Sequence, residues 1–186
     1  MAQIKSVPRP EPGAGVPTPK GEYLYIYFTD DIEKEPVIVA GKTSYAEDFK
    51  LKTDGKGILF YATPGTIEPV IEKTGETDSI AFIHGLKYAY PGPAADGVIS
   101  QLANKSFVAF HKTCAGGVAR KYGSKCCPLR FSDFAYTDNN EANKREITFK
   151  ATSPEKYLPI DYTGELPAVE EDAPVEGGGE GGGETA

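Results

Sequence analysis

The chain has 186 residues, enough for one domain of ordinary size, and its 11 Tyr, 9 Phe, 21 Gly and 15 Pro favour strands and turns over helices. Its formal net charge of −7 comes from residues 165–186, which hold seven acidic side chains and no Lys or Arg, so the remaining chain is formally neutral. This neutrality excludes binding of duplex DNA through a large basic field.

Residues 1–20 contain five prolines and almost no apolar side chains. This composition predicts an extended N-terminal arm of polyproline II type, either untethered or lying on a neighbouring subunit. The arm lacks the apolar core of a secretory signal, and no apolar run in the chain approaches the roughly 18 residues of a membrane span. We therefore expect a soluble protein, made in a cytoplasm, with no membrane contact and with reduced thiols.

Residues 21–164 are predicted to form one β domain. The stretch 21–30 alternates Tyr23, Tyr25 and Tyr27 with bulky apolar residues, so this strand needs cover on both faces and is either central or faces a partner. Further strands are expected at 36–41, at three places within 52–92, and at 106–111, 118–123, 129–137 and 144–152.

One short helix is expected at about 94–104, where apolar residues recur at helical spacing. Together, the expected strands and helix predict a mainly β fold: an antiparallel β-sandwich or barrel of about eight or nine strands with the helix on one flank. The Gly/Glu-rich segment 165–186 cannot bury enough surface to order, and we expect it to be an acidic, disordered tail.

All three cysteines lie in HKTCAGGVARKYGSKCCPLRF at 111–131. With His111 they could supply four zinc ligands, but the segment has no C-x-x-C spacing, and adjacent cysteines in a strand point to opposite faces. A disulfide across this predicted hairpin is geometrically possible, although a reducing compartment opposes it. The favoured interpretation is three reduced thiols that act as small apolar fillers, with no bound metal.

The sequence carries no recognisable catalytic arrangement. His84 and His111 lie in predicted strands outside any nucleophile motif, and no phosphate-binding glycine loop is present, so we expect neither an enzyme nor a cofactor. The basic stretch ARKYGSK at 119–125 is open to three interpretations: a solvated hairpin tip, a phosphate-contacting loop, or a charged tip that docks on another subunit.

The order of these elements resembles a known family. A Pro-rich arm is followed by YLYIYFTDDI, TPGTIE, GETDSIAFIHGLKYAYPGP, the helix ADGVISQLANKS, the cysteine-containing hairpin, NNEANKREITFKATSP and DYTGELP. This order, over roughly residues 4–164, is similar to that of the tail tube (major tail) proteins of long-tailed phages and prophages, especially a group found in gut Bacteroidales phages. The GGGEGGG tail is not part of the family pattern.

The resemblance implies a structural virion protein that is assembled in the bacterial host cytoplasm. In that family, subunits of a β-sandwich fold close into hexameric rings that stack as a tube, and DNA passes through the lumen during ejection. The implied partners are further copies of the chain, a tape measure protein, a tail terminator and distal tail proteins, with DNA present only in transit. Terminal arms and loops carry contacts between rings in such tubes.

On this interpretation, contacts between subunits are expected at two places. The first is the tyrosine-rich strand with Tyr23, Tyr25 and Tyr27, because tyrosine is enriched at interfaces. The second is the predicted hairpin tip, with the residues Arg120, Lys121, Tyr122 and Lys125. The alternatives are another virion β-module, such as a capsid decoration or head–tail completion protein, and a non-enzymatic ligand-binding β domain.

Overall fold

The computed structural model describes residues 20–91, 93, 96–114 and 118–170. These residues form thirteen strands and one helix: β1 (Lys20–Phe28), β2 (Ile32–Lys34), β3 (Ser44–Tyr45), β4 (Lys50–Leu51), β5 (Gly57–Tyr61), β6 (Glu68–Thr74), β7 (Ala81–Pro91), α1 (Asp96–Leu102), β8 (Phe107–Thr113), β9 (Ala119–Tyr122), β10 (Leu129–Asp138), β11 (Asn143–Ala151), β12 (Ile160–Tyr162) and β13 (Val169–Glu170). The prediction of a mainly β fold with one helix is confirmed.

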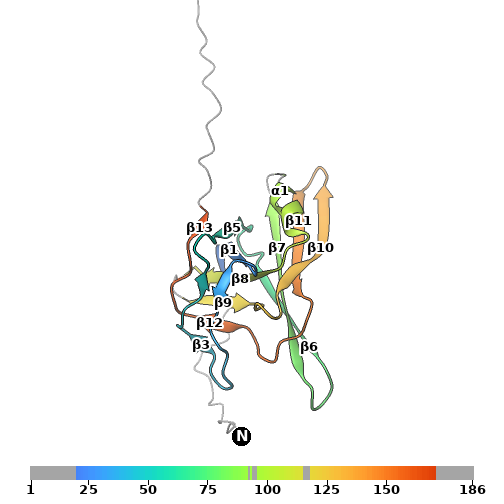
Figure 1. Ribbon diagram of the computed structural model, residues 1–186. Coiled ribbons are helices and arrows are strands. Elements are labelled where there is room, and N and C mark those ends of the chain that lie inside the picture. The colour runs from blue at the N-terminus through green and yellow to red at the C-terminus, as the bar shows by residue number, and fades with distance from the viewer. Residues whose placement is uncertain (1–19, 92, 94–95, 115–117, 171–186) are drawn as a thin grey trace, which may run out of the picture.

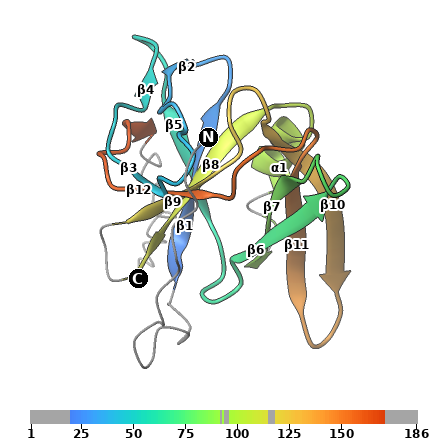
Figure 2. The same ribbon diagram turned by 90° about the horizontal axis from the view of Figure 1, so that it is seen from below.

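Eleven of the strands belong to one sheet that divides at β8 (Figure 1). On one side, β8 pairs with β1, and the order continues through β5 to β13. On its other side, residues 109–112 pair with β9, which leads to β12 and β3, whereas Phe107 pairs with Leu129 of β10. Beyond that single pair, β10, β11, β7 and β6 form a four-stranded antiparallel sheet of their own. Figure 2 shows this sheet standing beside the β1–β8 region, with α1 close to β7 and β10.

Strands β1 and β8 separate two hydrophobic cores. Leu24 and Ile26 point into the first core, together with Leu86, Ile147 and Phe149 of the four-stranded sheet. The intervening residues of β1 and β8 point into a second core of nine buried residues: Tyr27, Ile32, Tyr45, Phe49, Val108, Phe110, Ala119, Ile160 and Tyr162. The strand with bulky residues on both faces is therefore central, one of the two positions expected from its sequence.

Helix α1 closes one end of the first core. Its described length is shorter than the predicted 94–104, and residues 94–95 lie outside the described part of the chain. Ile99 and Leu102 are buried in the first core. Both carboxylate oxygens of Asp96 accept hydrogen bonds from Arg145 of β11, at 2.8 and 2.9 Å, so the helix is tied to the four-stranded sheet by a two-point ion pair.

Several sequence-based expectations are wrong in detail. The apolar run 36–41 forms no strand, and the side chain of Val37 is 82% exposed. The pairs β3–β12 and β5–β13 are parallel, so the sheet is mixed and not wholly antiparallel. The predicted tail starts too early, because residues 169–170 are strand β13 and the Tyr27 hydroxyl donates a hydrogen bond to the Pro167 carbonyl. Residues 1–19 and 171–186 lie outside the described part.

Candidate assembly interface

The four-stranded sheet has two open edges. Strand β6 pairs only with β7, and strand β10, beyond its pair at Leu129, only with β11. The order β10-β11-β7-β6 is antiparallel throughout, so β6 and β10 run in opposite directions. Within the described residues, each edge therefore presents backbone groups that could pair with another strand.

The register identifies the backbone groups that face each edge. The N–H and carbonyl of Ala89 bond to Thr66 and Thr63 on the β6 side of β7, so the odd residues of β7 face β6. Because backbone groups alternate sides along a strand, the odd residues of β6 face the open edge. These include Ile71 and also Pro69, whose missing N–H suits an edge strand.

By the same alternation, the backbone N–H and carbonyl groups of Phe134 and Tyr136 in β10 face the other open edge. Their side chains are 41% and 51% exposed, which is unusual for large aromatic groups. The Tyr136 ring stacks under the Arg145 guanidinium at 4.5 Å, and the two aromatic residues line a hollow next to α1. An exposed aromatic pair beside an open strand edge is typical of an interaction surface.

This edge could not be recognised from the sequence alone. The run LRFSDFAYTD does alternate aromatic with polar or small residues, which indicates a strand with one buried face. Whether such a strand lies at an edge depends on pairing with residues far away in the sequence, and that information is not local.

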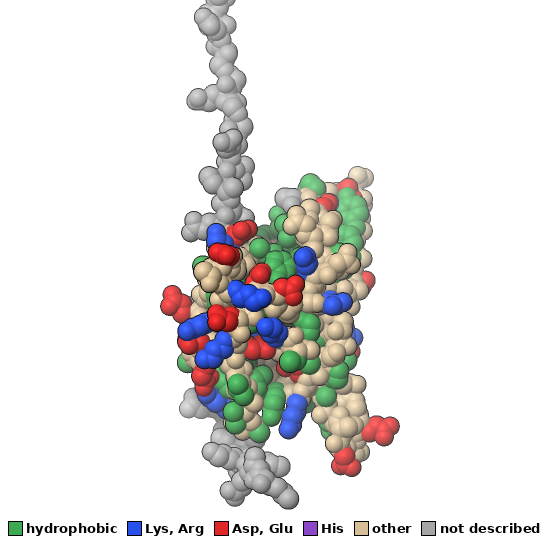
Figure 3. All heavy atoms as spheres, viewed as in Figure 1, with side chains coloured by type: hydrophobic (Ala, Val, Ile, Leu, Met, Phe, Trp, Pro, Cys, Tyr) green, Lys and Arg blue, Asp and Glu red, His purple; other side chains and the backbone are tan. Residues whose placement is uncertain are grey.

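The face of the four-stranded sheet that points away from the first core carries balanced charge. According to the register, its ionisable members are Lys87, Arg130, Lys144 and Lys150 on the basic side and Glu68, Glu72, Asp133 and Glu146 on the acidic side. Two ion pairs join them, Lys144–Glu146 at 3.1 Å and Lys150–Glu72 at 2.8 Å. In the view of Figure 3, basic and acidic side chains are interspersed mainly at the left, over the part of the molecule that holds β3, β9 and β12. This face of the four-stranded sheet has no excess of positive charge.

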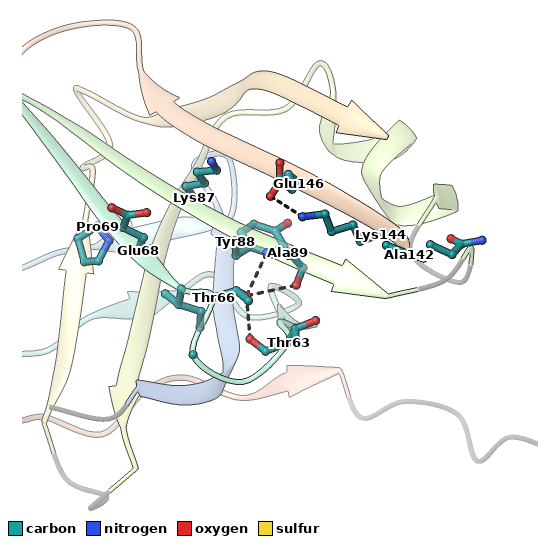
Figure 4. A pocket seen from close by; sticks show the side chains of 13 residues that line it. Thr63, Thr66, Glu68, Pro69, Lys87, Tyr88, Ala89, Ala142, Lys144 and Glu146 are labelled. Carbon is teal, nitrogen blue, oxygen red and sulfur yellow. Dashed lines mark hydrogen bonds and ion pairs between the residues drawn. The ribbon is translucent and has the colours of Figure 1, made fainter. Parts of the chain in front are cut away.

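A hollow of about 690 Å³ lies on the same sheet, between the turn at 63–67 and strand β11 (Figure 4). The turn is fixed to β7 because the Thr66 hydroxyl donates to the Thr63 carbonyl at 2.7 Å and accepts the Ala89 N–H at 3.0 Å. The Lys144–Glu146 pair crosses the opposite wall. The Thr66 hydroxyl thus ties this turn to the end of β7.

The three tyrosines expected at an interface have different environments. Tyr27 is fully buried in the second core, so its assignment as a contact residue is wrong: its ring packs against Phe49 and Phe110. Tyr25 is half-buried beneath the Lys112 ammonium, which lies 4.9 Å from the centre of its ring. Tyr23 is 42% exposed and remains available for contact.

The basic stretch is not a hairpin tip. Strands β8 and β9 do form the predicted hairpin, but Arg120, Lys121 and Tyr122 lie within β9, between β8 and β12. The Lys121 side chain is 2% exposed, its Nζ lies 2.9 Å from Glu35 Oε2, and Tyr122 is fully buried against His111. Neither Lys121 nor Tyr122 can reach a neighbouring subunit in this conformation, so both assignments are corrected.

Arg120 and Lys125 have exposed positions, although both make contacts within the chain. Arg120 Nε donates to Asp161 Oδ1 at 3.0 Å, at the surface. Lys125 follows β9 in a loop, and its Nζ donates to the Ile32 carbonyl at 2.9 Å. A contact with another subunit would therefore compete with these bonds.

The cysteines are free thiols, and they do not fill the core. Cys114 and Cys126 are exposed, and Cys127 is partly exposed. Cys126 and Cys127 lie in the loop between β9 and β10, not in a strand, so the expectation of opposite faces does not apply. Burial raises the pKa of the Cys127 thiol, with a further contribution from Glu155, and this disfavours the reactive thiolate.

Both histidines are buried and held neutral. The Gly123 N–H donates to His84 Nδ1 at 3.1 Å, so Nε2 carries the proton and donates to the Tyr157 carbonyl at 2.8 Å. Burial lowers the pKa of His84, against an opposing contribution from Glu155. Burial also lowers the pKa of His111 to about 4, with Lys20 and Arg120 adding to the effect. His84 thus links the segments of Gly123 and Tyr157, whereas the His111 ring stacks on Tyr122 at 5.3 Å.

Among residues 20–91, 93, 96–114 and 118–170, no three His, Cys, Asp or Glu side chains gather so that they could hold a metal ion. No helix in the described part of the chain is long and apolar enough to cross a membrane. Comparison with known proteins finds no matching family, no similar curated protein and no similar solved structure.

Proposed function

We propose that this protein is a structural subunit that assembles with copies of itself into rings, which stack as the tube of a phage tail. The rings are hexameric, as the sequence resemblance implies. The observation that carries the proposal is the four-stranded sheet with two open edges of opposite direction. A tube subunit of this kind works in the virion tail, after assembly in the host cytoplasm, as a conduit for DNA.

The geometry of the sheet supports ring closure. When the β6 edge of one copy meets the β10 edge of the next, the two strands run antiparallel, because the sheet has an even number of alternating strands. Every copy then continues the same antiparallel sheet, and a ring closes both open edges of the four-stranded sheet. Ile71 of one copy and the Phe134–Tyr136 pair of the next would meet at this junction, where their apolar surfaces cover each other.

The charge balance of the sheet supports a conduit. A strongly basic wall would retain DNA through many phosphate contacts and release of counterions. The outward face of the four-stranded sheet has as many acidic as basic members, and two of its ion pairs are internal. A barrel lined by this face would let DNA pass without holding it.

The proposal can be tested at the β6 edge. Ile71→Pro removes an N–H that faces the open edge and leaves the β6–β7 hydrogen bonds in place, whereas the control Ile71→Thr keeps that N–H and the strand propensity. We expect the unchanged chain and Ile71→Thr to form ring stacks visible by negative-stain microscopy at high concentration. Ile71→Pro should remain a folded monomer by light scattering and circular dichroism.

Two outcomes would refute the proposal. One is an unchanged chain that stays monomeric under all conditions, including after addition of tail-tip initiator proteins. The other is a folded Ile71→Pro variant that polymerises like Ile71→Thr. Trimers that bind capsids would favour a decoration protein instead.

A further inference from the structure

The two open edges of the four-stranded sheet restrict how one copy can pair with the next. Ile71 of β6 packs against the first core, and Tyr136 of β10 lines the hollow next to α1, so both side chains lie on the core side of the sheet. The backbone groups of both residues face an open edge. Residues directly opposite each other in an antiparallel ladder share both properties. Odd-numbered residues of β6 can therefore lie opposite only even-numbered residues in 133–138 of β10.

The lengths of the two edges narrow the choice of register. Strand β6 has seven residues. Beyond the irregularity between Phe131 and Asp133, residues 133–138 of β10 are paired on the β11 side alone. With Ile71 opposite Tyr136, β6 of one copy pairs with all of 133–138 in the next. A shift by two residues leaves part of 133–138 unpaired in either direction.

The charges on the outward face favour the same register. With Ile71 opposite Tyr136, no two carboxylates lie opposite each other. A shift by two residues in one direction places Glu72 opposite Asp133, and like charges at such positions destabilise a sheet. The same shift places Pro69 opposite Tyr136, where its missing N–H removes a hydrogen bond from the middle of the ladder. In the favoured register, Pro69 lies at the end of the ladder.

On the core side, this register places Ile71 next to a hollow of the neighbouring copy. The exposed rings of Phe134 and Tyr136 line this hollow of about 350 Å³ together with residues of α1, which lies close to β10 (Figure 2). Lys73 points to the same face as Ile71 and lies opposite Phe134, where its ammonium can reach the aromatic ring. A shift in the other direction replaces these contacts with Asp138 opposite Ile71, a carboxylate against an apolar side chain.

We propose that Ile71 of one copy pairs with Tyr136 of the next, and that this register tilts the strands of the tube wall by about 45° from its axis. Within one copy, Ile71 lies level with His84 of β7. Tyr136 lies level with Tyr90 of β7, because both pair with Arg145. Each junction therefore shifts the ladder by six residues, from His84 to Tyr90.

The tilt follows from this shift and from the width of the sheet. Six residues correspond to roughly 20 Å along a strand, while four strands add roughly 19 Å across the sheet. The ratio gives a tilt of about 45°, at the upper end of the range of about 35–45° that closed barrels adopt. The tilt does not depend on the number of copies in the ring. This register rests on the proposed self-assembly and specifies its contact.

The test uses pairs of introduced cysteines in a chain whose three natural cysteines are replaced by serine. Val70→Cys with Thr137→Cys places two thiols directly opposite each other on the outward face, with Cα atoms about 4.5 Å apart. The control pairs combine Val70→Cys with Ala135→Cys or Asn139→Cys and match a shift by two residues in each direction. In the proposed register their Cα atoms lie about 8 Å apart, too far for a disulfide. Val70 and Thr137 lie at opposite edges of one sheet, so a disulfide between them joins two copies.

After oxidation, non-reducing electrophoresis should show linked copies for the Val70–Thr137 pair at a yield at least tenfold above that of either control pair. Circular dichroism of the reduced chains establishes that the variants compared are folded. A control pair that links equally well overturns the register.

Light scattering of the same samples separates this result from the proposed function. Polymers that link through a control pair, or through no pair, leave self-assembly standing and reject the register. Chains that stay monomeric without any linked product reject both. Dimers linked through the Val70–Thr137 pair alone, without polymers, support the register and count against the tube.

Discussion

The buried ion pair between Lys121 and Glu35 predicts an asymmetry between two substitutions. The Lys121 side chain is 2% exposed and that of Glu35 20%, with Nζ and Oε2 2.9 Å apart. Glu35→Gln leaves an uncompensated ammonium in the interior, and breaking a buried pair in this way typically costs about 3–5 kcal/mol. Because water reaches Glu35 in part, we expect about 2–3 kcal/mol, or roughly 5–10 °C in Tm for a chain of this size.

Lys121→Met should behave differently. It removes the more deeply buried charge and fills a similar volume with apolar atoms, while Glu35 is 20% exposed and keeps the hydrogen bond from the Lys125 N–H to its Oε1 at 3.0 Å. Its Oε2 loses the Lys121 partner, so we expect a loss of about 1 kcal/mol in the free energy of unfolding, smaller than that of Glu35→Gln. Urea unfolding followed by far-ultraviolet circular dichroism and tyrosine fluorescence measures both variants. If Lys121→Met loses as much stability as Glu35→Gln, the reasoning is wrong.

Three further predictions concern the second core and its surroundings. Burial lowers the pKa of His111 from about 6.5 to about 4, so the neutral imidazole stabilises the fold above pH 6.5. As the pH falls from 6.5 to 4, the free energy of unfolding should decrease by up to about 3 kcal/mol. A urea midpoint that stays constant across this range would contradict this expectation. Gly57→Ala should cost about 2–3 kcal/mol, since a Cβ there collides with the Tyr27 ring, and unchanged thermal stability would exclude that collision. Tyr27→Phe should cost about 1 kcal/mol through the lost bond to Pro167, whereas no loss in urea unfolding would mean that this bond contributes nothing net.

Local patterns in the sequence predicted most strands well. The strand predicted from the alternation at 21–30 is β1. The strands predicted at 129–137 and 144–152 correspond to β10 and β11, with bounds that agree within one residue at each end. The prediction of a strand at 36–41 was wrong: in the described part of the chain no strand pairs with this run, and Val37 and Val39 are exposed. Propensity identifies residues that fit a sheet, but only tertiary pairing decides whether they join one.

The candidate contact residues were predicted less well, for a physical reason. Lysine is rarely buried, so the basic stretch indicated a surface tip. The partner that permits burial of Lys121 is Glu35, far away in the sequence, and their approach depends on strand pairings of both segments. Charge reversal at Arg120, Lys121 and Lys125 together would place a second carboxylate in the interior beside half-buried Glu35 and unfold the protein.

The two parallel strand pairs have a consequence for synthesis of the chain. Strand β3 needs β12 as its partner, and β5 gains its outer partner only from β13, near the end of the described chain. On the ribosome, the N-terminal half therefore exposes unpaired strand edges until translation is almost complete. We expect nascent chains that stop before residue 160 to be degraded readily by proteases, and pulse proteolysis of stalled ribosome complexes would show the protection arriving only with the last strands.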